Sequence, residues 1–257
     1  MITLADKIII STRPLTKNDS VKEYLTEKGA KVLDFPMIEI CTIKLDNRIT
    51  NILQNIITYQ WIVFTSKNGV ESFYKLLKSL KINTETLVSI KIAVIGKKTS
   101  EEVRKNNCEP FFVSKGNTSE DFLHELSKEI KINDSILLPL GELAADTLEK
   151  GLTVIGPVNR INVYKTSIPK VISQEILEII IKNNYNLIVF TSPSGVKNFK
   201  ITMKANKIYA DFRIGCIGKT TEKQILKYNF KPLVVSSIAT GENFAKELET
   251  FFITNKI

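Results

Sequence analysis

The stretch YQWIVFTSKNGVESF at residues 59–73 returns 126 positions later as YNLIVFTSPSGVKNF at residues 185–199. A second pair follows, because KIAVIGKKTSEEVRKNNCEPFFV (91–113) matches RIGCIGKTTEKQILKYNFKPLVV (213–235) at an offset of 122. The difference between the two offsets falls in the loop that joins the blocks, where length variation is expected. A period of about 122 is too long for a solenoid, so the repeat predicts two similar lobes.

Each copy alternates strand and helix patterns. Trp61–Thr65 and Leu187–Thr191 are unbroken apolar runs with β-branched residues, typical of strands buried on both faces. Ile92–Ile95 and Ile214–Ile217 are the next expected strands. Apolar residues at helical spacing follow the first pair of strands: Val70, Phe73, Leu77 and Leu80 in one copy, and Val196, Phe199 and Met203 in the other. This βαβα alternation predicts an α/β fold of parallel sheets with helices on both faces.

The composition is that of a globular protein. The 257 residues are 43% hydrophobic and 25% charged, with a mean hydropathy of +0.00, which excludes disordered, collagen-like and membrane-bundle chains. The net charge of +9 points weakly to an acidic partner, which could be nucleic acid, an anionic membrane or a polyanionic small molecule. Only five of the 36 basic residues are arginine, so a lysine-rich composition explains most of this excess.

Cysteine usage and the N-terminal segment favour a reducing, cytoplasmic compartment. Cys41, Cys108 and Cys216 form no C-x-x-C pair and do not suggest a disulfide framework. We expect no signal peptide, because no long apolar run follows a charged start, and no transmembrane helix. No cysteine or histidine cluster has metal-ligand spacing, so no metal is expected.

Four strand-to-helix junctions carry small hydroxyl residues and glycine: Thr65–Gly69, Gly96–Thr99, Thr191–Gly195 and Gly218–Thr221. One interpretation is that these residues do no more than cap the helices that follow them. Thr99 with Glu102 and Thr221 with Gln224 fit a capping box, and Ser192 before Pro193 fits an N-cap.

The same junctions can also bind anions. Helix N-termini present backbone N–H groups and a positive dipole end to phosphate or carboxylate, and ligands of parallel sheets bind outside the carboxyl ends of the strands. Basic residues nearby would add charge: Lys67, Lys97, Lys98, Arg213 and Lys219. The motifs G-x-x-x-x-G-K-[ST] and G-x-G-x-x-G are absent, which counts against nucleotide binding.

Other chemistries find little support. His124 is the only histidine and lies in a polar helix pattern, so a Ser-His-Asp or Cys-His centre is not expected. Trp61 is most simply a core residue. Tyr164 ends the run from Val154 and is either a buried edge residue or a hydroxyl that donates a hydrogen bond or proton in a cleft.

These motifs together resemble the uroporphyrinogen-III synthase family. The resemblance runs through STRP (11–14), the repeated FTS-x-x-x-V and IG-x-x-T motifs, VYKT (163–166) and TGENFAKEL (240–248). It implies two three-layer α/β lobes joined by a two-stranded linker near 36–42 and 160–168, with the active-site cleft between them. The first lobe would be 1–38 plus 167–257, and the second 39–166.

The resemblance also implies the reaction. A hydro-lyase of this family closes hydroxymethylbilane, a polycarboxylate with eight carboxylates, into uroporphyrinogen III through a spiro intermediate that inverts ring D. It works without a cofactor, as a cytoplasmic monomer, in heme biosynthesis.

Site residues carry over from the family by position. Tyr164 would assist departure of the substrate hydroxyl. The residues expected to bind substrate are Arg13, Thr65, Ser66, Asn68, Thr99, Ser192, Ser194, Arg213, Gly218, Thr220 and Thr221. The glutamine that usually follows the STRP arginine does not occur in LTKND (15–19).

Two alternatives stay open. The first is a non-catalytic two-lobe binding protein for an anionic small molecule, which would use the same helix N-termini. The second, nucleic-acid binding, rests on charge alone, since no aromatic RNA-binding pattern or basic helix occurs.

Overall fold

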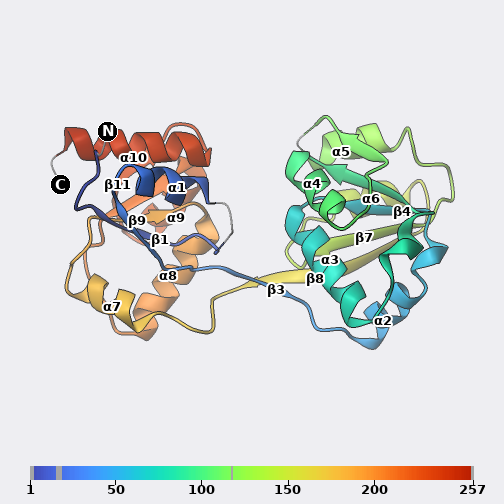
Figure 1. Ribbon diagram of the computed structural model, residues 1–257, viewed down its shortest axis with the longest axis horizontal. Coiled ribbons are helices and arrows are strands. Elements are labelled where there is room, and N and C mark those ends of the chain that lie inside the picture. The colour runs from blue at the N-terminus through green and yellow to red at the C-terminus, as the bar shows by residue number, and fades with distance from the viewer. Residues whose placement is uncertain (1–2, 16–18, 117, 256–257) are drawn as a thin grey trace. The chain divides into compact units, whose positions relative to one another are not determined.

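A computed structural model of the chain describes residues 3–15, 19–116 and 118–255. Part of the LTKND segment, residues 16–18, lies outside the described residues. The chain divides into two compact units: unit 1 comprises residues 1–39 and 167–257, and unit 2 comprises residues 40–166 (Figure 1).

Unit 1 holds a parallel five-stranded sheet in the order β11-β10-β9-β1-β2. Its elements in chain order are β1 (Ile8–Ser11), α1 (Ser20–Glu27), β2 (Lys31–Asp34), α7 (Gln174–Ile181), β9 (Leu187–Phe190), α8 (Pro193–Ala205), β10 (Ile214–Ile217), α9 (Gly218–Lys227), β11 (Pro232–Ser236) and α10 (Gly241–Thr254). The predicted strand at Ile214–Ile217 is confirmed residue for residue.

Unit 2 holds a sheet in the order β3-β8-β7-β4-β5-β6, in which β8, β7, β4, β5 and β6 are parallel. Only the first residue of β3, Glu39, and the last residue of β8, Ser167, belong to unit 1. Its elements are β3 (Glu39–Thr42), α2 (Asn47–Gln54), a 3-10 turn (Ile56–Thr58), β4 (Trp61–Phe64), α3 (Lys67–Ser79), a second 3-10 turn (Thr84–Leu87), β5 (Lys91–Ile95), α4 (Lys97–Lys105), β6 (Phe112–Ser114), α5 (Ser119–Leu126), β7 (Ile136–Gly141), α6 (Thr147–Thr153) and β8 (Val158–Ser167). The neighbouring strands β3 and β8 carry the chain between the units.

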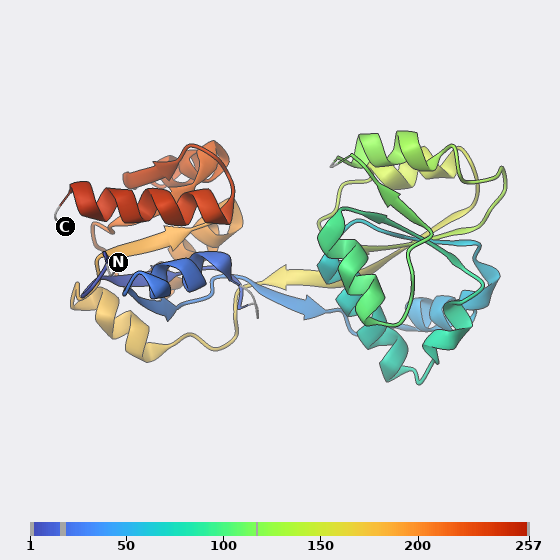
Figure 2. The same cartoon turned by 45° about the horizontal axis from the view of Figure 1, so that its top comes forward.

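Both sheets are covered by helices on two faces, as the unbroken apolar strands predict (Figure 2). In β4, Trp61 and Val63 pack with α5 and α6, whereas Ile62 and Phe64 pack with α2, α3 and α4. The corresponding strand β9 divides its side chains in the same way, toward α1 and α10 on one face and α7, α8 and α9 on the other. The α/β fold with three-layer units is therefore confirmed.

Two single-residue predictions are also confirmed. The Trp61 side chain is fully buried, and His124 is exposed on α5. None of the helices in the described residues is long and apolar enough to cross a membrane.

Candidate active site

The carboxyl ends of parallel strands meet at one edge of each sheet, and most of the predicted site residues lie there. In unit 2 this edge is formed by the neighbouring strands β8, β7, β4 and β5. Tyr164 belongs to β8, Gly141 ends β7, Thr65 and Ser66 follow β4, and Gly96 follows β5. The corresponding edge of unit 1 carries Arg13 after β1, Ser192 and Ser194 after β9, and Gly218, Thr220 and Thr221 after β10.

The serines of the repeated FTS motif cap the helices that follow them. Ser66 Oγ accepts a hydrogen bond from the Gly69 N–H at 3.1 Å, and Ser192 Oγ accepts one from the Gly195 N–H at 3.1 Å. The predicted N-cap at Ser192 with Pro193 at the first helical position is confirmed. Both helices therefore begin directly at the carboxyl edge, with the remaining N–H groups of their first turns close to it.

The second pair of junctions is built differently from the prediction. Gly96 and Gly218 have φ values of +74° and +69°, a region that favours glycine, and they turn each strand directly into its helix. The helices α4 and α9 begin at Lys97 and Gly218, so Thr99 and Thr221 lie inside the first turn. The capping-box assignment of these two threonines is therefore wrong.

The predicted residues differ in how open they are. Thr99 and Thr221 are 4% and 1% exposed, so their hydroxyls are closed to solvent. Ser194 and Thr220 are exposed, and Gly218 is buried. The half-buried residues are Arg13, Thr65, Ser66, Asn68, Tyr164 and Ser192.

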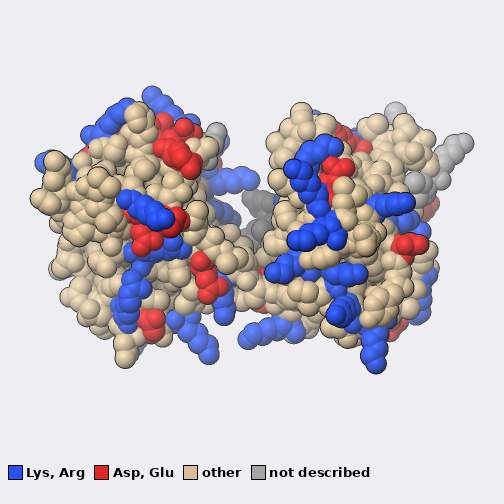
Figure 3. Space-filling view, turned by 180° about the vertical axis from the view of Figure 1, so that it is seen from behind, with Lys and Arg blue, Asp and Glu red and all other residues tan. Residues whose placement is uncertain are grey.

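The local positive charge is smaller than the sequence suggested, because three of the lysines have acidic partners. Lys67 Nζ lies 3.1 Å from a Glu71 oxygen and 3.9 Å from a Glu102 oxygen. Lys97 lies 3.9 Å from Glu101, and Lys219 lies 3.1 Å from Glu222. On the face shown in Figure 3, basic side chains are spread over both units with acidic ones among them.

Arg13 is also paired. Its Nε lies 3.1 Å from an Asp19 oxygen, and the other oxygen of that carboxylate accepts from the N–H groups that begin α1. A methyl group at Gly241 would lie 3.8 Å from the Arg13 guanidinium. Arg13 therefore lies close to the start of α10 as well, at the carboxyl edge.

The prediction that Arg213 binds substrate is corrected by the structure, because this residue lies at the opposite edge of the unit 1 sheet. It precedes β10, and its guanidinium donates to the carbonyl oxygens of Asn183, at 3.1 Å, and Tyr185, both ahead of β9. It also stacks over the Tyr185 ring at 4.7 Å. A residue at the amino end of a parallel strand is a full strand length from the ligand edge, so Arg213 is structural here.

Sequence reasoning missed Gly141. Tyr164 and Gly141 are register partners, and the Tyr164 ring lies where a side chain of residue 141 would be. A glycine at the end of the buried run ILLPLG was the available signal, since glycine in a strand often marks a bulge or a close approach.

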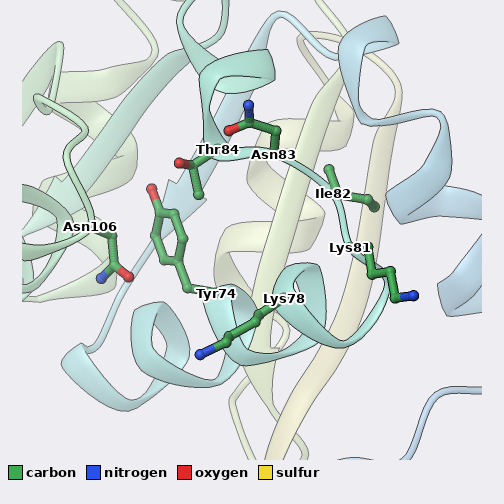
Figure 4. A pocket seen from close by; sticks show the side chains of 7 residues that line it. All are labelled: Tyr74, Lys78, Lys81, Ile82, Asn83, Thr84 and Asn106. Carbon is green, nitrogen blue, oxygen red and sulfur yellow. The ribbon is translucent and has the colours of Figure 1, made fainter.

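One pocket of about 420 Å³ lies away from these residues (Figure 4). It is formed at the C-terminal ends of α3 and α4, opposite the carboxyl edge where both helices begin. Its lining residues are Tyr74, Lys78, Lys81, Ile82, Asn83, Thr84 and Asn106. None of the predicted site residues lines it.

Fold and site together define an α/β protein of two similar units, with hydroxyl groups and helix N-termini at the carboxyl edges of its sheets. The sequence model of the family described as "Uroporphyrinogen-III synthase HemD" matches residues 19–246, and the chain belongs to this family. A relative from Methanocaldococcus jannaschii is 31% identical over 232 residues, which cover 88% of this chain and 91% of that protein.

Other similar proteins carry names that agree with this family assignment. The uroporphyrinogen-III synthase of Chlorobaculum parvum is 24% identical, with 94% of this chain and 98% of that protein covered. The chain spans about half, 48%, of the porphyrin biosynthesis protein HemD of Ruminiclostridium josui, with 25% identity. Among solved structures, the synthase of Helicobacter pylori has the same fold, with a TM-score of 0.64, 17% identity and coverage of 95% and 99% of the two chains.

Proposed function

We propose that this chain is a uroporphyrinogen-III synthase, a hydro-lyase that closes hydroxymethylbilane into uroporphyrinogen III with inversion of ring D and without a cofactor. The observation that carries the proposal is the family match over residues 19–246, which includes most of both units. The likeness of both units to a solved synthase supports it at the level of the fold.

The first step is loss of the substrate's terminal hydroxyl, and Tyr164 is the group proposed to assist it. Its phenol is half-buried at the carboxyl edge of unit 2, where a proton donated to the hydroxyl lets it leave as water. The substituted carbon of ring D then attacks the methylene left behind. The resulting spiro intermediate rearranges, and ring D is inverted.

The carboxylates of the substrate need donors, and both carboxyl edges offer them. We propose that the substrate is held by backbone N–H groups at the starts of α3, α4, α8 and α9 and by side chains at the same edges. The side chains proposed for this role are Arg13, Thr65, Ser66, Asn68, Ser192, Ser194 and Thr220. The buried residues Thr99, Gly218 and Thr221 would act as parts of the first turns of α4 and α9, which present the N–H groups. Lysine charge contributes less, because Lys67, Lys97 and Lys219 are paired with glutamates.

The protein's contribution is largely conformational. The linear bilane also closes unaided to the symmetrical type I isomer, so the enzyme must hold the chain in the conformation that favours the spiro route. The family resemblance further supports a cytoplasmic monomer that acts in heme biosynthesis.

An isomer-resolved product assay tests the proposal. Purified protein given hydroxymethylbilane should raise the ratio of type III to type I uroporphyrinogen above that in buffer and above that with heat-denatured protein. An unchanged ratio would remove the proposed activity. Tight binding of the bilane with an unchanged ratio would instead support a non-catalytic binding protein.

A further inference from the structure

Tyr164 does not stand alone at the carboxyl edge of unit 2, because its phenol oxygen lies 3.3 Å from Ser66 Oγ. Ser66 already accepts the N–H of Gly69, and a serine hydroxyl can accept a second hydrogen bond and donate one. The Ser66–Tyr164 distance is longer than the roughly 2.8 Å typical of O–H···O hydrogen bonds. Catalytic hydrogen bonds of this kind often tighten only when substrate binds.

The backbone next to the Tyr164 ring also leaves a defined space for that ring. A Cβ atom at position 141 would lie 2.6 Å from Tyr164 Cζ and 2.8 Å from its hydroxyl oxygen. The pairing of β7 with β8 shifts between Leu140 and Gly141, so that Gly141 lies opposite Tyr164 rather than Val163. Such irregularities redirect side chains near active sites. The Glu142 N–H holds the local backbone by donating to the Tyr164 carbonyl at 2.9 Å.

We infer that Ser66 and Gly141 are positioning residues for Tyr164: the serine hydroxyl holds the phenol oxygen, and the glycine leaves the space that the ring occupies. The inference deepens the proposed function and rests on it wherever turnover is the readout. Neither residue is asked to touch the reacting atoms in this role, since both act through the tyrosine.

The internal repeat supplies a matched control. Ser192 caps α8 with the same 3.1 Å hydrogen bond that Ser66 makes at α3, but its hydroxyl lies 3.2 Å from Ser194 Oγ. The substitutions S66A and S192A therefore remove equivalent helix caps, and only S66A removes the tyrosine's neighbour. S66G is a second variant, because glycine at an N-cap preserves most of the helix stability.

A readout independent of turnover comes first. In protein labelled with 13Cζ-tyrosine, the Tyr164 resonance is the one missing from Y164F. We expect S66A, S66G and G141A to shift it and S192A to leave it in place, with similar decreases in urea midpoint for S66A and S192A. A Tyr164 resonance unmoved by all three of S66A, S66G and G141A would overturn the inference.

Turnover is then measured in a double-mutant cycle. S66A should lower kcat for type III product by about two- to tenfold, as expected for one neutral hydrogen bond. In a Y164F background S66A should cause no further loss of kcat, whereas independent effects on kcat would multiply and contradict the inference. Any contact of Ser66 with the substrate itself would instead raise KM to the same extent in both backgrounds. If wild-type protein leaves the isomer ratio of buffer unchanged, the proposed function fails, and the resonance experiment alone decides the inference.

Discussion

Ser66 and Ser192 occupy the same position in the two repeats, but their hydroxyls face different neighbours. The local geometry is set by the TS-x-x-G sequence, since each serine caps a helix by accepting the N–H of a glycine three positions on. The surroundings are set by residues far away in the sequence, because β8 brings Tyr164 next to Ser66 although 98 positions separate the two residues. Sequence could therefore predict the caps, but not the pairing that distinguishes the two serines.

Replacing Tyr164 with phenylalanine tests the residue proposed to assist hydroxyl departure. We expect Y164F to lower kcat by about 100-fold or more, the contribution usual for general acid catalysis. The urea midpoint should change little, because the half-buried ring remains. Y209F is the control, since Tyr209 is 73% exposed and lies outside the proposed site. An unchanged rate in Y164F would remove the tyrosine from the mechanism.

Cys216 offers a test of the core of unit 1. Its side chain is fully buried in β10, and burial raises the pKa of its thiol to about 12. The reactive thiolate is therefore scarce in the folded protein at pH 8, whereas an unfolded thiol with a pKa of about 8.5 ionises readily there. Iodoacetamide at pH 8 should label Cys216 in 8 M urea but not in buffer.

Site-resolved mass spectrometry gives the readout for this labelling. The half-buried Cys108 serves as the internal comparison. Labelling of Cys216 in buffer as fast as in urea would contradict its burial. The C216A variant should leave the native labelling of the other sites unchanged.

The strands and helices were predictable largely because apolar runs and helical spacing are strong in both repeats. Where the prediction failed, at the starts of α4 and α9, a glycine with positive φ ended the strand and began the helix without a capping side chain. A threonine followed by an acidic or amide residue three positions on caps a helix only when the helix begins at that threonine, and α4 and α9 begin before Thr99 and Thr221. Sequence alone does not give that backbone conformation.

The turn between β5 and α4 gives a stability prediction. Gly96 has φ +74° and ψ 159°, a region that is essentially restricted to glycine, although a methyl group there would meet nothing within 4 Å. G96A should therefore lower the free energy of unfolding by about 1–3 kcal/mol through backbone strain alone.

Urea unfolding followed by circular dichroism measures this loss. K97A provides the neighbouring control, because the Lys97 side chain is 90% exposed and a surface change there should cost no more than about 0.5 kcal/mol. Equal stabilities of G96A and wild type would show that the turn tolerates a side chain.

The two units differ in how their chain is assembled. Residues 40–166 of unit 2 are continuous, whereas unit 1 combines residues 1–39 with 167–257. The repeat indicated two lobes, but it could not decide which N-terminal and C-terminal blocks pack together. That choice depends on β1 lying between β2 and β9, a long-range pairing with no local signature.

We expect the fragment 40–166 to fold by itself. It contains its own sheet and a packed apolar cluster on each face. It should unfold cooperatively in urea, yet leave the product isomer ratio of hydroxymethylbilane at the value in buffer, because the predicted site residues of unit 1 are absent. The comparison is unit 1 alone, with residue 39 joined to residue 167 by a glycine-serine linker. A fragment without a cooperative transition would contradict this independence.

The split of unit 1 has a consequence for synthesis on the ribosome. Strands β1 and β2 emerge first, yet Ile9 of β1 pairs with Leu187 of β9, which is made only after all of unit 2. Domains fold as units during translation, so unit 2 is expected to form while β1 still lacks its second neighbour. A nascent chain paused near residue 166 therefore exposes the apolar side chains of Ile9 and Ile10 and an open strand edge, the feature that chaperones and unwanted partner strands recognise.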